Sequence, residues 1–125
     1  MLSDLEIYAV VPASDLGRAR EFYRDKLGLE PAQEVGEGLI YEGAGGTKFL
    51  LYETQFAGTA QNTAMNWATQ DLDAEMAELR GRGVVFEDYD FPGFTTENGV
   101  LDSDDGRAAW FKDSEGNILA LSEGM

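Results

Sequence analysis

The first thirty residues change from an apolar run to a helical pattern of apolar positions. Glu6–Val11 is mostly apolar on both faces, which predicts a strand. Ser14 or Asp15 then suits a helix N-cap, because its side-chain oxygen can accept from free backbone amides. Gly28 suits the C-terminal cap. Between the caps, helical spacing predicts a buried stripe of Leu16, Ala19, Phe22, Tyr23 and Leu27.

Three short strands are predicted after this helix. Their expected ranges are Pro31–Val35, Leu39–Tyr41 and Lys48–Glu53. Glycine-rich turns divide them, the clearest being 43–46. Residues 56–63 are then polar and small, which indicates a linker rather than another strand.

The same order of elements returns after the linker. Ala64–Thr69 predicts a strand, and Asp71 opens a helix. The apolar stripe of this helix is Leu72, Met76 and Leu79, and its end is marked by Gly81 and Gly83.

Three further strands complete the second copy. Val84–Tyr89 is expected to be a strand, followed by a loop that contains Pro92, Gly93 and Gly99. Ala108–Lys112 and Asn117–Ser122 are expected to pair as a hairpin through the turn at 113–116.

The repeat predicts one α+β domain over residues 1–125, built from two βαβββ modules. Module 1 is expected at about 5–54, the linker at about 55–63 and module 2 at about 64–123. One such unit leaves a face of its sheet uncovered. Two units side by side would form a curved mixed sheet with helices on its convex face and a concave cup, and concave surfaces are where small molecules bind.

Composition removes several kinds of chemistry. The chain has 43% hydrophobic residues, no cysteine and no histidine. It therefore has no disulfide, no thiolate site and no Ser-His-Asp triad, and any metal would need oxygen ligands alone. No apolar run could span a bilayer, and the start MLSDLE does not resemble a signal peptide. We expect a cytoplasmic protein.

The formal net charge of −15 argues against nucleic acid and anionic membranes as partners. The charge could attract a cationic ligand, or it could only keep the surface solvated, and the spread of acids along the chain favours the second interpretation. The acidic segment Leu101–Gly106 has the same two readings. It could guard the mouth of the cup, and a solvated turn is the more favoured interpretation.

Three motifs resemble the vicinal oxygen chelate superfamily, which includes glyoxalase I, extradiol dioxygenases, and fosfomycin and bleomycin resistance proteins. They are VVPASDLGRAREFYRDKLGL near the start, DLDAEMAELRGRGV in the middle and WFKDSEGNILAL at the end. They occur in the family's order and span nearly the whole chain. The resemblance implies the glyoxalase/bleomycin resistance-like fold, but this fold hosts many activities.

The resemblance also implies where a metal would bind. Metal-dependent members use four inward-facing positions, which here are Tyr8, Leu50, Ala64 and Ala120. Leucine and alanine carry no ligating side-chain atom, and a tyrosine of ordinary pKa is a poor ligand at neutral pH. We therefore expect no metal and no other cofactor, and what remains resembles the metal-free binding branch of the superfamily, of which bleomycin resistance proteins are the known example.

Strand alternation extends these four positions to their neighbours on the same face. The predicted ligand-binding residues are Tyr8, Val10, Leu50, Tyr52, Ala64, Asn66, Trp110, Ala120 and Ser122. Such a wall of aromatic, amide and hydroxyl groups suits a planar or amphipathic ligand. For Trp110, a place in the core or at a subunit interface is weighed equally with ligand contact. Trp67 is expected in the core beneath the second helix.

Two functions fit these features. The first is a non-catalytic protein that binds or sequesters a small cationic or aromatic molecule, with no catalytic residue. The alternative is a metal-independent isomerase or lyase, whose base would be a carboxylate or a perturbed Tyr8, Tyr52 or Lys48. The binding protein is favoured, because no carboxylate maps into the cup. The resemblance also implies a homodimer, since these folds often pair to complete or extend the cup.

Overall fold

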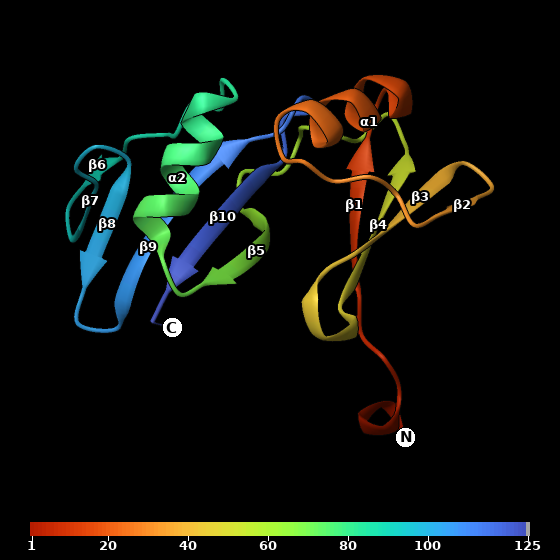
Figure 1. Cartoon of the computed structure of the whole chain (residues 1–125), viewed down its shortest axis with the longest axis horizontal. Helices are drawn as coiled ribbons and strands as arrows, with labels where there is room; N and C mark the ends of the chain where they lie inside the picture. The colour runs from red at the N-terminus through yellow and green to blue at the C-terminus, as the bar shows by residue number, and fades with distance from the viewer. Residues whose placement is uncertain (125) are drawn as a thin grey trace.

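The computed structural model describes residues 1–124 (Figure 1). The first half contains α1, two short 3-10 helices and four strands: η1 (Leu2–Asp4), β1 (Ala9–Ala13), α1 (Leu16–Asp25), β2 (Gln33–Val35), β3 (Gly38–Glu42), η2 (Ala44–Gly46) and β4 (Lys48–Glu53). The second half contains β5 (Thr63–Thr69), α2 (Leu72–Gly81), β6 (Asp90–Phe91), β7 (Phe94–Thr95), β8 (Val100–Ser103), β9 (Gly106–Lys112) and β10 (Ile118–Glu123).

Each half forms its own four-stranded mixed sheet. The strand orders are β1-β4-β3-β2 and β5-β10-β9-β8, so the two sheets have the same topology. β1 pairs in parallel with β4, and β5 pairs in parallel with β10, while the remaining neighbours are antiparallel. Figure 1 shows the two sheets beside one another, each with its own helix. The predicted α+β fold with a repeated βαβββ order is confirmed.

The helices begin where the acidic caps predict. Asp15 accepts a hydrogen bond from the amide of Arg18, and Asp71 accepts one from Ala74. A second carboxylate also assists each N-terminus, where free amides favour negative charge. α2 receives Glu123 from its own sheet, at 2.9 Å from the amide of Leu72.

The assisting carboxylate of α1 comes from the other half of the molecule. Glu115, in the turn between β9 and β10, accepts from the amide of Asp15 at 2.9 Å. The same carboxylate binds Arg18 through Nε at 2.8 Å and Nη2 at 3.0 Å. Burial acts to raise the pKa of Glu115, but the hydrogen bonds from Arg18, Asp15 and Ser114 outweigh it and lower the pKa to about 2.

A second buried contact joins the halves at the same turn. The hydroxyl of Tyr23 on α1 donates to the carboxylate of Asp113 at 2.7 Å, and both residues are buried. Burial, followed by the nearby charge of Asp113, raises the pKa of Tyr23 well above its ordinary value. The amide of Asn117 also donates to the carbonyl of Pro12 at 2.8 Å. The 113–117 turn therefore fastens the second sheet to α1 and β1.

An aromatic core lies between α1 and the first sheet. Tyr41 and Phe49 are stacked at 4.9 Å between ring centroids, and Tyr23 packs on Tyr41 at 5.5 Å. The hydroxyl of Tyr41 is buried and has no hydrogen-bond partner within residues 1–124. Burial raises the pKa of Tyr41 to about 12. In the second half Trp67 stacks on Phe111, which confirms that Trp67 lies on the helix side of its sheet.

Three strand assignments differ from the sequence prediction by more than two residues. Val84–Tyr89 is wrong as a strand, because only Phe86 forms a bridge, with Phe111. The loop expected after it contains the small β6–β7 hairpin and the whole of β8. β1 begins at Ala9 rather than at Glu6. The residues before it form an arm (residues 1–8) that extends away from the first sheet in Figure 1.

Candidate functional site

The first sheet presents an uncovered apolar face opposite α1. Val10, Leu50 and Ile40 lie side by side on neighbouring strands of this face. Val10 is 55% exposed, although it sits within the sheet. Tyr8 and Tyr52 border the same surface at 51% and 38% exposure. An apolar surface of this kind is available to a ligand or to another protein chain.

A hollow of about 240 Å³ lies on this face. Its lining includes three of the predicted site residues: Tyr8, Leu50 and Tyr52. Two carboxylates that were not predicted, Glu37 and Glu53, also line it. Glu37 directly precedes β3 and Glu53 ends β4, so both lie at strand ends. Alternation counted along β4 alone does not place them at this hollow. We call this surface the first half-site.

The second sheet carries the remaining predicted residues. Ala64 and Asn66 are exposed on β5, and the Asn66 amide donates to the Ser122 hydroxyl at 2.9 Å. Ala120 lies between Asn66 and Trp110 in the strand register. Ala120 and Ser122 are only 4% and 6% exposed. A ligand on this face of the single chain would therefore contact Asn66 before either of them.

Trp110 belongs to an aromatic cluster that was not predicted. Its ring is half-buried and packs against Phe94 at 5.2 Å and Tyr89 at 5.9 Å. Its indole nitrogen donates to the hydroxyl of Thr63 at 3.1 Å. The β6–β7 hairpin supplies Phe94, so the cluster depends on an element that the sequence pattern did not reveal. We call this face of the second sheet, from Asn66 to Trp110, the second half-site.

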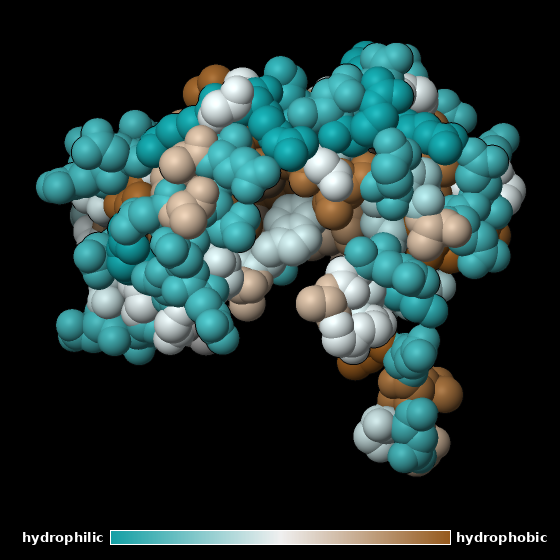
Figure 2. Space-filling model, in the orientation of Figure 1, coloured by the Kyte–Doolittle hydropathy of each residue, from teal (hydrophilic) through white to brown (hydrophobic). Residues whose placement is uncertain are grey.

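The two half-sites are separate surfaces of the chain. The hollow of the first half-site is lined by no residue of the second sheet. Figure 2 shows an open notch between the two halves of the molecule, on the side towards which the N-terminal arm extends. The residues predicted for a single cup therefore lie on two separate surfaces of one chain.

The four family ligand positions offer no set of metal-binding atoms. Tyr8 and Leu50 lie in the first half-site, while Ala64 and Ala120 lie on the paired strands β5 and β10. Within residues 1–124 no group of three His, Cys, Asp or Glu side chains is placed to hold a metal ion. These side chains do not fit the metal centre of the superfamily's metal-dependent members.

The superfamily resemblance is supported by an independent match. The model of one protein family, the Glyoxalase/Bleomycin resistance protein/Dioxygenase superfamily, matches residues 7–121. The chain belongs to this superfamily. The resemblance predicted from the three motifs is therefore confirmed, and the two repeated sheets are its shared scaffold. No protein of known, curated function matches the chain.

Solved structures of this superfamily resemble the whole chain. A glyoxalase/bleomycin resistance protein from Catenulispora acidiphila DSM 44928 is 28% identical, with a TM-score of 0.66, and the match covers 95% of this chain and 97% of that chain. TnmS3, an antibiotic-binding protein from Streptomyces sp. CB03234, is 25% identical, with a TM-score of 0.63, and the match covers 95% of this chain and 96% of that chain.

A more distant structure shares the fold alone. The fosfomycin resistance protein FosX from Listeria monocytogenes, solved with Mn(II) and sulfate, is 16% identical, with a TM-score of 0.71. The match covers 100% of this chain and 93% of that chain.

Within residues 1–124 neither α1 nor α2 is long and apolar enough to cross a membrane.

Proposed function

We propose that the protein binds a small aromatic cation without a metal and without catalysis. The observation that carries this proposal is the first half-site, where exposed Tyr8 and Tyr52 stand beside Glu37 and Glu53. Aromatic faces and carboxylates both attract cations, and an apolar floor favours a ring or hydrocarbon body. The four family ligand positions lack suitable atoms, so the ligand is held by side chains alone.

The comparisons support a binding role at this level. TnmS3 is described as an antibiotic-binding protein, and at 25% identity it covers nearly the whole chain. A drug or secondary metabolite is therefore a reasonable class of ligand. The acidic charge of −15 favours positively charged members of that class.

We also propose that two copies of the chain form the working protein. Each half-site is open on one side, and the arm exposes Leu2 at 78% and Ile7 at 91%. Burial of such side chains against a second copy stabilises each of them by roughly 1.5–3 kcal/mol. A homodimer would cover the arm and could place the first half-site of one copy opposite the second half-site of its partner.

A metal-independent isomerase or lyase is the second candidate. Glu37 and Glu53 favour it, because a carboxylate beside a bound substrate can act as a general base. Replacing either carboxylate would then remove turnover while leaving ligand affinity largely unchanged. In a binding protein the same replacement would lower affinity and no turnover would exist.

Thermal unfolding in the presence of aromatic amines and antibiotics tests the binding role. A ligand that binds only the folded state raises the melting temperature. At one hundred times its dissociation constant it stabilises the folded protein by about 2.7 kcal/mol. A Tyr52→Ala variant should lose most of this shift. Phe56→Ala is the matched control, since Phe56 is 67% exposed and does not line the hollow.

The proposal would be wrong if cationic and neutral aromatic compounds gave the same small shift. It would also be wrong if Tyr52→Ala and Phe56→Ala behaved alike with every ligand found. Sedimentation velocity tests the dimer separately. A chain that lacks residues 1–6 should sediment mainly as a monomer, and a full-length monomer at working concentration would refute the two-copy arrangement.

A further inference from the structure

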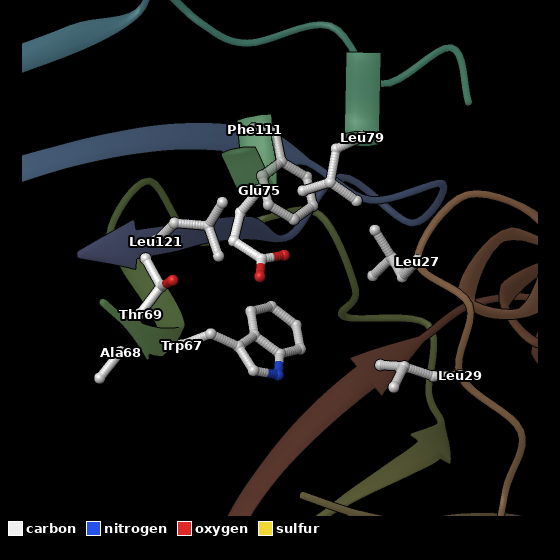
Figure 3. A pocket seen from close by; sticks show the side chains of 9 residues that line it. All are labelled: Leu27, Leu29, Trp67, Ala68, Thr69, Glu75, Leu79, Phe111 and Leu121. Carbon is white, nitrogen blue, oxygen red and sulfur yellow. The ribbon is translucent and has the colours of Figure 1, made fainter. Parts of the chain in front are cut away.

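Another pocket lies on the second sheet, on the face opposite to the second half-site. Its volume is about 250 Å³, and Figure 3 shows the side chains around it. The floor is the stacked pair Trp67 and Phe111, whose ring centroids are 6.4 Å apart. Leu79 of α2 and the Leu27–Leu29 segment after α1 form the walls. The pocket is thus built by both halves of the chain.

A single carboxylate, that of the exposed residue Glu75, borders this apolar pocket. Figure 3 shows the Glu75 side chain of α2 directed towards the space above Trp67. Glu75 forms no ion pair within residues 1–124, although nine such pairs involve other residues there. No lysine or arginine lines the pocket. Glu75 is exposed and lies in the first turn of α2, so solvent and the helix N-terminus share its charge, and no basic side chain of the pocket competes with a cationic ligand for it.

These features together select one class of ligand. An indole ring attracts a cation through its negative face, and a carboxylate at the same pocket attracts it through its charge. Leucines and Phe111 would cover an uncharged hydrocarbon or ring. The volume is below that of pockets for drug-sized ligands, which begin at roughly 300 Å³. The ligand would therefore have about one ring.

We propose that this pocket is a second binding site, selective for small aromatic monocations such as an arylalkyl ammonium ion. The ammonium group lies between Glu75 and the indole of Trp67, and the ring lies against Leu27, Leu79 and Phe111. The site uses no residue of either half-site, so it is independent of the proposed function. Occupancy would stabilise the contact between the two halves, since both contribute walls.

Two matched compounds test the charge selectivity. Benzylamine is protonated at pH 7, while benzyl alcohol has nearly the same size and is neutral. Each is titrated into the full chain while ¹H–¹⁵N spectra follow the indole N–H signals of Trp67 and Trp110, which a Trp110→Phe variant assigns. Benzylamine should move the Trp67 signal saturably, with a roughly millimolar dissociation constant for so few atoms. Benzyl alcohol should bind at least about fivefold more weakly.

Variants then assign the selectivity to one side chain. Glu75→Gln should weaken benzylamine binding about three- to tenfold and leave benzyl alcohol unchanged, because it removes one charge near the ammonium group. Glu21→Gln on α1 removes the same charge away from the pocket and should change neither. Tyr52→Ala should leave the Trp67 response intact, which separates this site from the first half-site.

Three results would overturn the proposal. The first is a Trp67 signal that moves linearly, or not at all, with benzylamine. The second is equal affinity for the amine and the alcohol. The third is an equal effect of Glu75→Gln and Glu21→Gln, which would assign the selectivity to the overall negative field. Failure of the half-site experiments would leave each of these measurements unaffected.

Discussion

Removing one hydroxyl from either of two neighbouring buried tyrosines should change stability in opposite directions. Tyr23 and Tyr41 pack together at 5.5 Å between ring centroids, and they are 0% and 1% exposed. The Tyr23 hydroxyl donates to the Asp113 carboxylate at 2.7 Å, while the Tyr41 hydroxyl has no partner within residues 1–124. Tyr→Phe removes only the oxygen, so both rings keep their packing.

The magnitudes follow from what each oxygen does. A hydrogen bond to a charged group contributes roughly 1.5–3 kcal/mol, and Tyr23→Phe also leaves Asp113 with one donor fewer. We expect Tyr23→Phe to lower the free energy of unfolding by about 2 kcal/mol. A buried hydroxyl without a partner costs about 1–3 kcal/mol. We therefore expect Tyr41→Phe to raise the free energy of unfolding by about 1 kcal/mol.

Urea unfolding at pH 7 measures both variants on one scale. The two midpoints should fall on opposite sides of the wild-type midpoint, with unchanged m-values. In thermal unfolding the same differences correspond to roughly 3–5 °C per kcal/mol for a chain of this size. Equal shifts in the same direction would refute the assignment. If both midpoints rose, the Tyr23–Asp113 bond would not stabilise the contact between the two halves, and if both fell, the Tyr41 hydroxyl would not be a destabilising group.

Three other predictions concern acid, metal and the second half-site. Because the folded pKa of Glu115 is lowered to about 2 from 4.5, its contribution is complete above about pH 4.5 and is lost as pH falls through 2. The free energy of unfolding should fall by at most about 3 kcal/mol through this group. In a Glu115→Gln variant the free energy of unfolding should fall less steeply as the pH is lowered. Elemental analysis of the purified protein should find far less than one transition metal ion per chain, and about one Zn, Mn, Fe or Ni per chain would contradict the metal-free proposal. Trp110→Ala should lower the affinity for an aromatic ligand at least about tenfold through lost stacking and area. A variant that loses several kcal/mol of stability while keeping its affinity would place Trp110 in the core instead.

Local signals in the sequence predicted the repeated elements well. The caps Asp15 and Asp71 act on amides three residues away, and the glycine turn after Asp113 acts within one hairpin. Such short-range chemistry is visible in a single sequence. β4, at Lys48–Glu53, was predicted with its bounds as the structure has them.

The pattern of apolar and polar residues did not predict contacts between residues far apart in the sequence. Phe86 looks like part of a strand, but it pairs with Phe111 at one bridge only, because β8 takes the next place beside β9. The Phe94–Trp110 contact depends on a hairpin of two-residue strands, which is too short to give a periodic signal. The division of the cup into two half-sites depends on how whole sheets pack, and alternation within a strand does not determine this.

The carboxylates that assist the two helix N-termini come from different places in the chain, and this affects the order in which the chain can fold. The second half carries Glu123 for α2, so a fragment of residues 63–125 contains both partners of this contact. The first half lacks Glu115, which completes the start of α1. During synthesis α1 therefore leaves the ribosome nearly one hundred residues before its carboxylate partner. We expect the isolated first half to show weak helical circular dichroism that increases when the second half is added in trans.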